Sequence, residues 1–291
     1  MSHIAYVNGR YLPQKQAHVH IEDRGYQFAD GVYEVICVWN GVPADYAAHI
    51  VRLNRSLAEL RMASPISDAG LKLVLQEVVR RNHLERGTIY IQINRGVAPR
   101  AHTFPGAGVR PSLVVTAKHG AGPSDALAEE GVKVISTPDL RWGRRDIKSV
   151  GLLPNALAKQ AAMEAKAYEA LLYTPDGTVT EASASNAWIV TPDKTIVTHP
   201  ATHAILGGVT RATVLKMARA AGYVVKERAF TLDEVRKAKE VFLTGTTTFV
   251  MPVIDVDGRP VANGGAGIIA LDLRRRYRAY LDELTDAAWN A

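Results

Sequence analysis

Lys148 stands at an unusual position for a lysine. It belongs to the segment Asp146–Val150, "DIKSV", which reads as a short extended stretch, while the alanine-rich pattern that predicts a helix begins only at residues 152–166. Burial of an ammonium group lowers its pKa and makes the amine a better nucleophile. Such an amine can hold an aldehyde as a Schiff base. A solvated loop lysine is the simpler interpretation for this residue taken alone.

A second candidate is an anion site in "AILGGVTRATVLKMARAAG". Gly207 and Gly208 permit a tight backbone turn, and the helix predicted from Thr210 directs its free N–H groups at whatever lies before it. The Thr210 hydroxyl can join those amides around a phosphate. Residues 244–248, "TGTTT", end an apolar strand, where a loop would present further hydroxyl groups to a ligand. Neither segment has the spacing of a nucleotide P-loop, so nucleotide binding is not predicted.

Glu181, in "TVTEASASNAWIV", is a third candidate. It stands near the end of a predicted strand, before a run of small polar residues. A carboxylate beside a cofactor can pair with a protonated pyridine nitrogen and so keep the ring an electron sink. A surface glutamate is the simpler interpretation for this residue alone.

Candidate groups for binding a carboxylate occur in "VAPRAHTFP" and "GVYEVICV". If residues 97–104 are extended, Arg100 and His102 lie two positions apart and project from the same face. In the second segment the same alternation places Tyr33 on the face opposite Glu34, so the Tyr33 hydroxyl can serve as a third donor. The three side chains together predict a trap for a substrate carboxylate.

The elements that must position these groups fall into two parts. Residues 1–117 read as an α/β domain, with strands before and after two helices. Residues 118–131 are polar and contain glycine, which predicts a linker, and residues 132–291 read as a strand-rich domain with helices around it. The apolar residues at helical spacing are Ile50, Leu53, Leu57 and Leu60 in the first helix and Leu71, Val74, Leu75 and Val78 in the second.

Composition indicates an ordinary globular protein, with 47% hydrophobic residues among 291. The start of the chain lacks the apolar region of a signal peptide, and no apolar run is long enough to cross a bilayer, so we expect a cytoplasmic protein without a membrane partner. Cys37 is the single cysteine, which excludes an internal disulfide and a multi-cysteine metal site. The histidines have no metal-binding spacing, so no metal is predicted.

The net charge of +6 could suit a nucleic-acid partner, but the basic residues are scattered and no recognition motif is present. The densest basic cluster, "DLRRRYRAYLDEL", falls on a C-terminal helix whose apolar stripe includes Leu273, Tyr277, Tyr280, Leu281 and Leu284. A solvated helix face explains this cluster. No nucleic-acid partner is therefore predicted, and a non-catalytic basic binding protein is the alternative from a different functional class.

Six segments, taken together, resemble a known family. They are "DRGYQFADGVYE", "HIVRLNRS", "INRGVAPRAH", "RRDIKSVGLLPNALAKQ", "TVTEASASNAW" and "LGGVTRATVL". Their order and spacing resemble those of the class IV, fold-type IV pyridoxal-phosphate aminotransferases, and within that family most closely the D-amino acid aminotransferases. The resemblance covers nearly the whole chain. It implies a homodimer of two-domain α/β chains, with a smaller N-terminal α/β domain, a larger strand-rich pseudo-barrel domain, and pyridoxal 5'-phosphate between them.

The resemblance also implies an activity and roles for single residues. The activity is transfer of the amino group from D-alanine or related D-amino acids to 2-oxoglutarate, giving pyruvate and D-glutamate. Lys148 matches the Schiff-base lysine, and Glu181 matches the partner of the pyridine nitrogen. The positions that match the phosphate cup are Arg52, Val209, Thr210 and Thr246. The positions that match the substrate side are Tyr33, Arg100 and His102, of which Arg100 and His102 are expected to reach in from the neighbouring subunit.

Two positions depart from the family pattern. Ala184 replaces a residue that is often serine, so it supplies no hydroxyl, and Gly245 stands where a phosphate-binding hydroxyl is often found. L-branched-chain aminotransferases and aminodeoxychorismate lyases share the lysine, the glutamate and the phosphate cup, so both remain alternatives within the same fold. The range of amino donors, the preferred keto acid and the pathway are not determined by the sequence.

Overall fold

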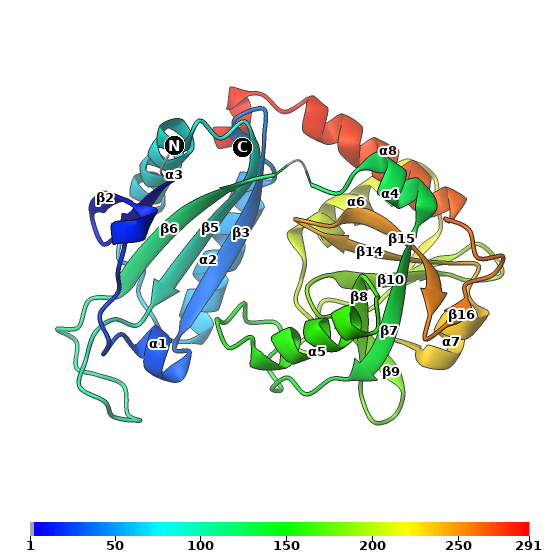
Figure 1. Cartoon of the computed structure of the whole chain (residues 1–291), viewed down its shortest axis with the longest axis horizontal. Coiled ribbons are helices and arrows are strands. Elements are labelled where there is room, and N and C mark those ends of the chain that lie inside the picture. The colour runs from blue at the N-terminus through cyan, green and yellow to red at the C-terminus, as the bar shows by residue number, and fades with distance from the viewer. Residues whose placement is uncertain (1–2, 121, 291) are drawn as a thin grey trace. The chain divides into compact units, whose positions relative to one another are not determined.

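The computed structural model describes residues 3–120 and 122–290, which form two compact units (Figure 1). Unit 1 comprises Met1–Ala121, Ile147–Gly151 and Asp282–Ala291, and unit 2 comprises Gly122–Asp146 and Leu152–Leu281. The chain first passes from unit 1 to unit 2 inside the predicted linker, residues 118–131. The residues after this linker do not all fall in unit 2, because two of their segments belong to unit 1.

Unit 1 is built on a six-stranded antiparallel sheet with the strand order β2-β1-β6-β5-β3-β4. Its strands are β1 (Ile4–Val7), β2 (Arg10–Pro13), β3 (Gly31–Trp39), β4 (Val42–Pro43), β5 (Arg86–Asn94) and β6 (Ser112–His119). Its helices are α1 (Arg24–Phe28), α2 (Tyr46–Glu59) and α3 (Asp68–Asn82), with 3-10 turns η1 (Gln14–Gln16) and η2 (Asp286–Trp289). Strands β3 and β5 pair over their whole length.

One face of this sheet packs against α2 and α3 (Figure 1). The isoleucines at alternate positions of β5 are fully buried on that face, because successive side chains of a strand point to opposite sides. The helical spacing predicted for both helices is confirmed, since its residues lie in or against the same core: Ile50, Leu53, Leu57, Leu60, Leu71, Val74, Leu75 and Val78. The other face carries the hydrogen-bonded side chains of Tyr90, Gln92 and Asn94 from β5.

Two late segments join unit 1 because each buries an apolar side chain there. Ile147 is 4% exposed and Trp289 is 7% exposed, and both belong to the core of unit 1. Trp289 also packs on the ring of Tyr46. The predicted extended segment Asp146–Val150 forms a single bridge, from Ser149 to Val32, rather than a strand.

Unit 2 contains a mixed sheet of ten strands in the order β12-β11-β10-β14-β15-β7-β8-β9-β13, with β16 paired to β15. Its strands are β7 (Val132–Pro138), β8 (Glu169–Tyr173), β9 (Thr178–Ala182), β10 (Asn186–Val190), β11 (Ile196–Thr198), β12 (Val225–Glu227), β13 (Phe230–Thr231), β14 (Glu240–Gly245), β15 (Phe249–Val256) and β16 (Arg259–Pro260). Its helices are α4 (Asp125–Glu130), α5 (Leu153–Glu164), α6 (Val209–Ala220), α7 (Leu232–Lys237) and α8 (Ile268–Asp282).

The large sheet curls around one apolar core. Strands that are far apart in the sheet order contribute to the same buried cluster, for example through Val179 in β9, Val197 in β11 and Met251 in β15. This architecture agrees with the predicted strand-rich pseudo-barrel domain. Lys148 precedes α5 and is not part of it, as the sequence predicts.

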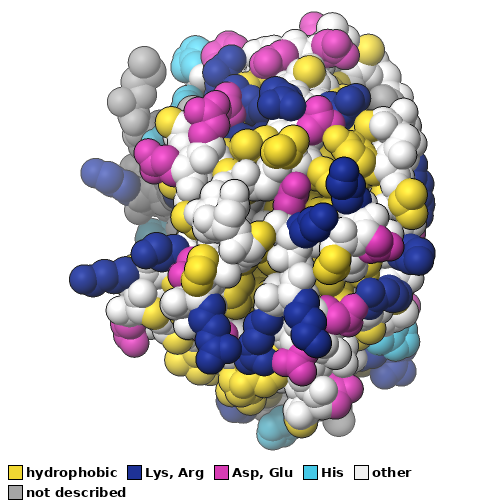
Figure 2. Space-filling view, turned by 90° about the vertical axis from the view of Figure 1, so that its right-hand side faces the viewer, with side chains coloured by type: hydrophobic (Ala, Val, Ile, Leu, Met, Phe, Trp, Pro, Cys, Tyr) yellow, Lys and Arg dark blue, Asp and Glu magenta, His cyan; other side chains and the backbone are white. Residues whose placement is uncertain are grey.

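The net positive charge is not gathered into one patch on the face that Figure 2 shows. There, basic and acidic side chains lie side by side, with apolar side chains between them. Among residues 3–120 and 122–290, none of the helices combines the length and the apolar character that spanning a bilayer requires.

Candidate active site

Lys148 lies in a segment that is attached to two elements of unit 1. Its carbonyl accepts a hydrogen bond from the Tyr33 N–H at 3.0 Å, and the Val150 N–H donates to the Gly31 carbonyl at 3.0 Å. The Lys148 N–H also donates to the hydroxyl of Ser56 on α2, at 3.4 Å. The backbone that carries the lysine is thereby held against β3 and α2, so its side chain starts from a defined place.

The Lys148 side chain is half-buried and lies over an aromatic ring. Its Nζ is 4.1 Å from the centre of the Tyr33 ring, and Tyr33 stacks on Tyr90 with ring centres 5.6 Å apart. Burial, and then the neighbouring Tyr33, raise the pKa of Tyr90 to about 12. The Tyr90 hydroxyl therefore keeps its proton at neutral pH. The amine of Lys148 is thus partly withdrawn from water and lies on the face of an aromatic ring.

A chain of hydrogen bonds holds the polar face of β5. The Tyr90 hydroxyl donates to Gln92 at 2.7 Å, the Gln92 amide donates to Asn94 at 2.8 Å, and the Asn94 amide donates to Asp23 at 2.7 Å. Asp23 also accepts from the Ser112 hydroxyl at 2.6 Å. The sequence analysis missed these residues, although polar side chains alternating with isoleucines in one strand were a usable signal. Through this chain, the ring stack beside Lys148 is tied to the rest of unit 1.

Arg52 is paired with a buried carboxylate on the core side of β3. Its Nε and Nη2 donate to the two oxygens of Glu34, each at 2.7 Å, and His49 Nδ1 lies 2.7 Å from the same carboxylate. Glu34 is fully buried, opposite in direction to Tyr33, as the strand alternation predicts. No local pattern indicates that Arg52 has this partner. Ser56, which accepts from the Lys148 N–H, lies one helical turn after Arg52, so both belong to the same face of α2.

The electrostatics of this cluster depend on the ion pair. Burial by itself raises the pKa of Glu34, but the charge and hydrogen bonds of Arg52, aided by His49, outweigh it and lower this pKa to about 2. Burial lowers the pKa of His49 below 6.5, although Glu34 opposes this. Loss of Arg52 would leave a buried carboxylate without its main partner, which is costly. Glu34 therefore fixes the orientation of the Arg52 guanidinium and makes the core sensitive to acid.

Replacing Glu34 by glutamine is expected to reduce the loss of stability in acid. Because the pKa of Glu34 is about 2 in the folded chain and 4.5 ordinarily, its ionised form stabilises the fold fully above about pH 4.5. This contribution is lost as the pH falls toward 2. Urea unfolding between about pH 5 and pH 3 should therefore show a smaller drop in the free energy of unfolding for Glu34→Gln than for the wild type.

Glu77 provides a matched control, because its pKa is also lowered to about 2, by hydrogen bonds from Arg80 and Arg81, yet it lies on the exposed surface of α3. Salt at about 0.5 M should remove the contribution of Glu77 and leave that of Glu34. Equal sensitivity of Glu34→Gln and Glu77→Gln to salt would contradict the assignment of Glu34 to the core.

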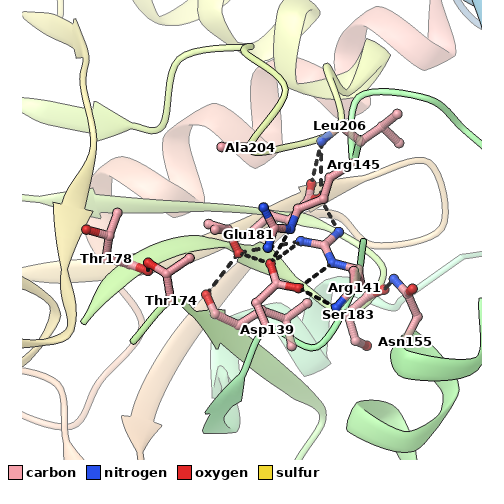
Figure 3. A network of polar contacts seen from close by, with 12 residues as sticks. Asp139, Arg141, Arg145, Asn155, Thr174, Thr178, Glu181, Ser183, Ala204 and Leu206 are labelled. Atoms are coloured by element: carbon pink, nitrogen blue, oxygen red, sulfur yellow. Dashed lines mark hydrogen bonds and ion pairs between the residues drawn. The ribbon is translucent and has the colours of Figure 1, made fainter. Parts of the chain in front are cut away.

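Glu181 is the centre of a polar network in unit 2 (Figure 3). It is 4% exposed, and its carboxylate forms an ion pair with Arg141 Nη1, accepts from the Asn186 amide at 3.0 Å, and accepts from the Leu206 N–H at 3.1 and 3.2 Å. Burial raises the pKa of Glu181, while Arg141 and the Leu206 N–H oppose the rise. A carboxylate has about four lone-pair positions, and these three donors leave room for one more donor. The site therefore fits a protonated ring nitrogen.

Arg141 is held in place by a second buried carboxylate. Its Nη2 lies 2.8 Å from Asp139, which also accepts from the Thr180 hydroxyl at 2.7 Å and pairs with Arg145 at 2.9 Å. Arg141 thus bridges Asp139 and Glu181, as Figure 3 shows. The sequence analysis missed both Asp139 and Arg141, since an arginine two residues after an aspartate has no distinctive pattern. The bridge holds a positive charge against Glu181 and favours its ionised form.

The helix start predicted as an anion site lies at Gly208. Helix α6 begins at Val209, and its first helical hydrogen bond is donated by Ala212 to the Gly208 carbonyl. The N–H groups of Val209 and Thr210 precede this pattern, and both residues are buried. A Cβ at Gly208 would lie 2.0 Å from the Asn186 side-chain oxygen, so a larger residue here would displace Asn186, which donates to Glu181. The amides at this helix start are therefore placed to bind an anion.

The hydroxyl run begins in the last two residues of the apolar strand β14 and continues through the turn before β15. Thr246 is half-buried in the turn between β14 and β15, and α6 packs against β14. Gly245, the residue before it, lies beside Ser185, whose Cβ would be 3.4 Å from a Cβ added at Gly245. Thr244 is used within the fold, since its hydroxyl accepts from the Trp188 ring N–H at 2.8 Å.

Arg100 and His102 are both exposed, in a segment of unit 1 that is not a strand. Only Val97 pairs, in a single bridge with Asp23. The Arg100 guanidinium and the His102 ring nevertheless approach one residue, Phe28, at 4.8 and 5.6 Å from its ring centre. Both side chains are therefore gathered on one side of their segment.

Each unit brings together some of the site residues that the sequence predicts. In unit 1 the structure places Lys148 over Tyr33 and beside the helix that carries Arg52. In unit 2 it connects Glu181 through Asn186 to the carbonyl of Leu206, three residues before α6. Among the residues that the structure describes, no three His, Cys, Asp or Glu side chains gather in a way that could hold a metal ion.

A family model and similar proteins from other organisms indicate the same family for this chain. A family model described as amino-transferase class IV matches residues 31–256. The chain is 44% identical over 260 residues to a D-alanine aminotransferase from Bacillus licheniformis, and the match covers 89% of this chain and 90% of the relative. It is 40% identical over 277 residues to a D-alanine aminotransferase from Staphylococcus aureus (strain MSSA476), covering 95% of this chain and 97% of the relative.

Solved structures with the same fold include branched-chain enzymes. The branched-chain amino acid aminotransferase from T.th., with pyridoxamine 5'-phosphate, has a TM-score of 0.89 and 29% identity, and the match covers 100% of this chain and 97% of that chain. The branched-chain aminotransferase of Thermoproteus uzoniensis, with norvaline, has a TM-score of 0.86 and 26% identity, covering 99% and 98%.

Proposed function

Because the chain belongs to the class IV aminotransferases, we propose that it transfers the amino group of D-alanine and related D-amino acids to 2-oxoglutarate, giving pyruvate and D-glutamate. The observation that carries this proposal is the 44% identity to a D-alanine aminotransferase, against 29% to a branched-chain enzyme of the same fold. Pyridoxal 5'-phosphate is the cofactor of this family, and the half-buried amine, the buried carboxylate and the amides at a helix start all fit it.

Lys148 is proposed to attach the cofactor covalently and to move a proton at the substrate Cα. When bound, pyridoxal 5'-phosphate supplies an aldehyde carbon for the amino group and a ring that withdraws electrons. The position of Lys148 supports this role, because its backbone is held against β3 and α2 and its half-buried amine lies over the Tyr33 ring. The same amine can then act as a general base.

Glu181 is proposed to accept a hydrogen bond from the protonated ring nitrogen. Its ion pair with Arg141 supports this, because an ionised carboxylate stabilises a protonated nitrogen more strongly than a neutral one does. Arg141 is in turn fixed by Asp139, so the orientation of Glu181 depends on the network in Figure 3.

The phosphate of the cofactor is proposed to bind at the start of α6. The N–H groups of Val209 and Thr210, the Thr210 hydroxyl and Thr246 are the proposed donors in unit 2, and Arg52 is the proposed cation. The ion pair with Glu34 presents Arg52 as a rigid planar group, which suits phosphate oxygens. Gly245 contributes no hydroxyl, only its backbone N–H.

The substrate carboxylate is proposed to bind Tyr33, Arg100 and His102, the last two from a neighbouring subunit in a homodimer. The exposure of Arg100 and His102, away from the core of their own unit, supports this. Holding the carboxylate there, with the Cα hydrogen directed to Lys148, selects one hand of amino acid. The likeness to D-alanine aminotransferases favours the D hand.

Exposed apolar side chains support a second copy as the partner. Leu153 and Leu157 lie one turn apart on α5 and are 71% and 58% exposed. Such residues are favoured at contacts between chains. Light scattering of the purified protein measures whether its mass is that of two chains. A cytoplasmic location stays a prediction of the sequence, which cell fractionation tests.

Activity with D-alanine and 2-oxoglutarate is the direct test of the proposed function. Pyruvate and D-glutamate are expected to appear together, at a rate at least about tenfold above that with L-leucine as donor, since holding a carboxylate on one side favours one hand. A preference for L-leucine would establish the branched-chain alternative. Release of pyruvate from aminodeoxychorismate without an amino acceptor would establish the lyase alternative.

A further inference from the structure

The segment that carries Arg100 and His102 is anchored by a buried arginine. Arg24 is 3% exposed, and its N–H donates to the Gly96 carbonyl at 2.9 Å. Its Nη1 donates at 2.6 Å to the carbonyl of Ala101, the residue between Arg100 and His102. An exposed segment without strand pairing is thereby tied to α1 at two points.

The anchor is itself fixed by charge. Arg24 Nε lies 2.8 Å from Asp30, and the same carboxylate oxygen pairs with Arg95 at 2.7 Å. Burial raises the pKa of Asp30, but the hydrogen bonds and charges of Arg95 and Arg24 outweigh it and lower the pKa. Arg95 also donates to the Leu60 carbonyl at 2.9 Å, which connects the start of the segment to the end of α2.

The ring of Phe28 lies among three cationic or titratable side chains. The guanidinium carbon of Arg24 is 4.6 Å from its centre and that of Arg100 is 4.8 Å from it, while His102 meets it edge to face at 5.6 Å. Phe28 is half-buried and is not a member of the buried core of unit 1. Its ring therefore contacts the carboxylate-binding candidates rather than the interior of the sheet.

Such a contact matters because an exposed arginine has many rotamers. Ordering them when a carboxylate binds reduces the affinity, and a side chain that already rests against an aromatic face loses less freedom on binding. A guanidinium over an aromatic ring is also held by electrostatic attraction. Phe28 thus offers one surface that orients both Arg100 and His102.

We propose that Phe28, backed by Arg24, is a positioning residue that holds Arg100 and His102 in the orientation in which they bind the substrate carboxylate. This inference rests on the proposed function, which assigns the carboxylate to those two side chains. Phe28 itself does not touch the substrate. Its loss should therefore weaken carboxylate binding and leave the chemical step unchanged.

The experiment compares the steady-state kinetics of the holoenzyme with D-alanine for Phe28→Leu and for two controls. Phe28→Leu is expected to raise KM about three- to tenfold with kcat within about twofold of the wild type. The reason is that the cation–ring contact of Arg100 and the edge-to-face ring contact of His102 are both removed. Phe28→Tyr keeps the ring and should restore KM. Tyr26→Leu, which removes the 76% exposed ring two residues earlier on α1, should leave both constants unchanged.

A binding measurement separates positioning from a loss of folding. The dissociation constant of propionate, which has a carboxylate but no amino group, is measured by calorimetry and should rise by the same factor in Phe28→Leu. An unchanged dissociation constant and KM in Phe28→Leu would overturn the inference, whatever happens to the melting temperature. If Phe28→Leu does not fold, Phe28→Met takes its place, because methionine is close in volume and has no ring. The same rise in KM and in the dissociation constant of propionate is then expected.

Arg100→Ala distinguishes failure of this inference from failure of the proposed function. It is expected to lower kcat/KM for D-alanine about ten- to a hundredfold, as loss of a charged hydrogen bond does. If Arg100→Ala has this effect and Phe28→Leu has none, the positioning role is wrong and the carboxylate site stands. If Arg100→Ala has no effect on KM or on propionate binding, the carboxylate site is wrong, and the positioning role is rejected with it.

Discussion

Replacing Lys148 by alanine is expected to lower kcat for transamination of D-alanine by about a thousandfold or more, because the variant loses both the covalent attachment and the general base. The side chain lies half-buried, 4.1 Å from the centre of the Tyr33 ring, and its backbone is held by β3. Removing it should disturb the fold little, so the melting temperature should change by only a few degrees while activity is lost.

Chemical labelling locates the attachment. Borohydride reduction of the holoenzyme, followed by peptide mapping, should place the pyridoxyl group on Lys148. Lys159 is a matched control, because its Nζ also lies over a tyrosine ring, 4.9 Å from that of Tyr168, and pairs with Glu169 at 3.5 Å. Lys159→Ala should retain the label and most of the activity. A label on Lys159, or on any other lysine, would remove the assignment of Lys148.

Replacing Glu181 by glutamine is expected to lower kcat by about a hundredfold while the affinity for pyridoxal 5'-phosphate stays within about threefold. A neutral amide does not stabilise a protonated ring nitrogen, so the ring withdraws fewer electrons and proton removal from the substrate slows. The amide is close in shape to the carboxylate, and the N–H of Leu206 can still donate to its oxygen. Stopped-flow measurement of the first half-reaction, beside equilibrium binding of the cofactor, separates the two effects.

Glu169 is the control for a buried glutamate in the same unit. It is 1% exposed, accepts from the Ala170 N–H at 2.9 Å, and is hydrogen-bonded by the Ser183 hydroxyl. Glu169→Gln is expected to change stability and leave the rate of the first half-reaction nearly unchanged. If both glutamine variants slow that step equally, the effect of Glu181 comes from disturbed packing and not from its charge.

The network around Glu181 explains why its neighbours matter for this prediction. In Glu181→Gln the ion pair with Arg141 is lost, but Asp139 still holds Arg141 at 2.8 Å. The charge of Arg141 is then no longer compensated by Glu181, which would disfavour a further positive charge, such as a protonated ring nitrogen, beside residue 181. Asp139 and Arg141 therefore increase the loss of kcat expected for Glu181→Gln.

Local patterns in the sequence determined much of the fold. The spacing of leucine, isoleucine and valine identified α2 and α3, and strand alternation placed Tyr33 and Glu34 on opposite faces of β3. These features depend on residues within one or two turns of each other, so a single stretch of sequence contains all the information. The position of Lys148 outside α5 follows from the same kind of pattern. The match to six family segments added the roles of residues, which no local pattern provides.

Only the tertiary structure decided which charges meet. Arg141 lies 40 positions from Glu181, Arg24 lies 77 positions from Ala101, and nothing near either arginine in the sequence marks its partner. The same holds for the return of Ile147 and Trp289 to unit 1, since each is one apolar residue whose burial depends on space left by elements far away in the chain. Helix and strand periods arise from local geometry, whereas ion pairs and core membership arise from packing over long sequence distances. For this reason the sequence by itself could determine which side chains are capable of the chemistry, and the fold was needed to show what holds them in position.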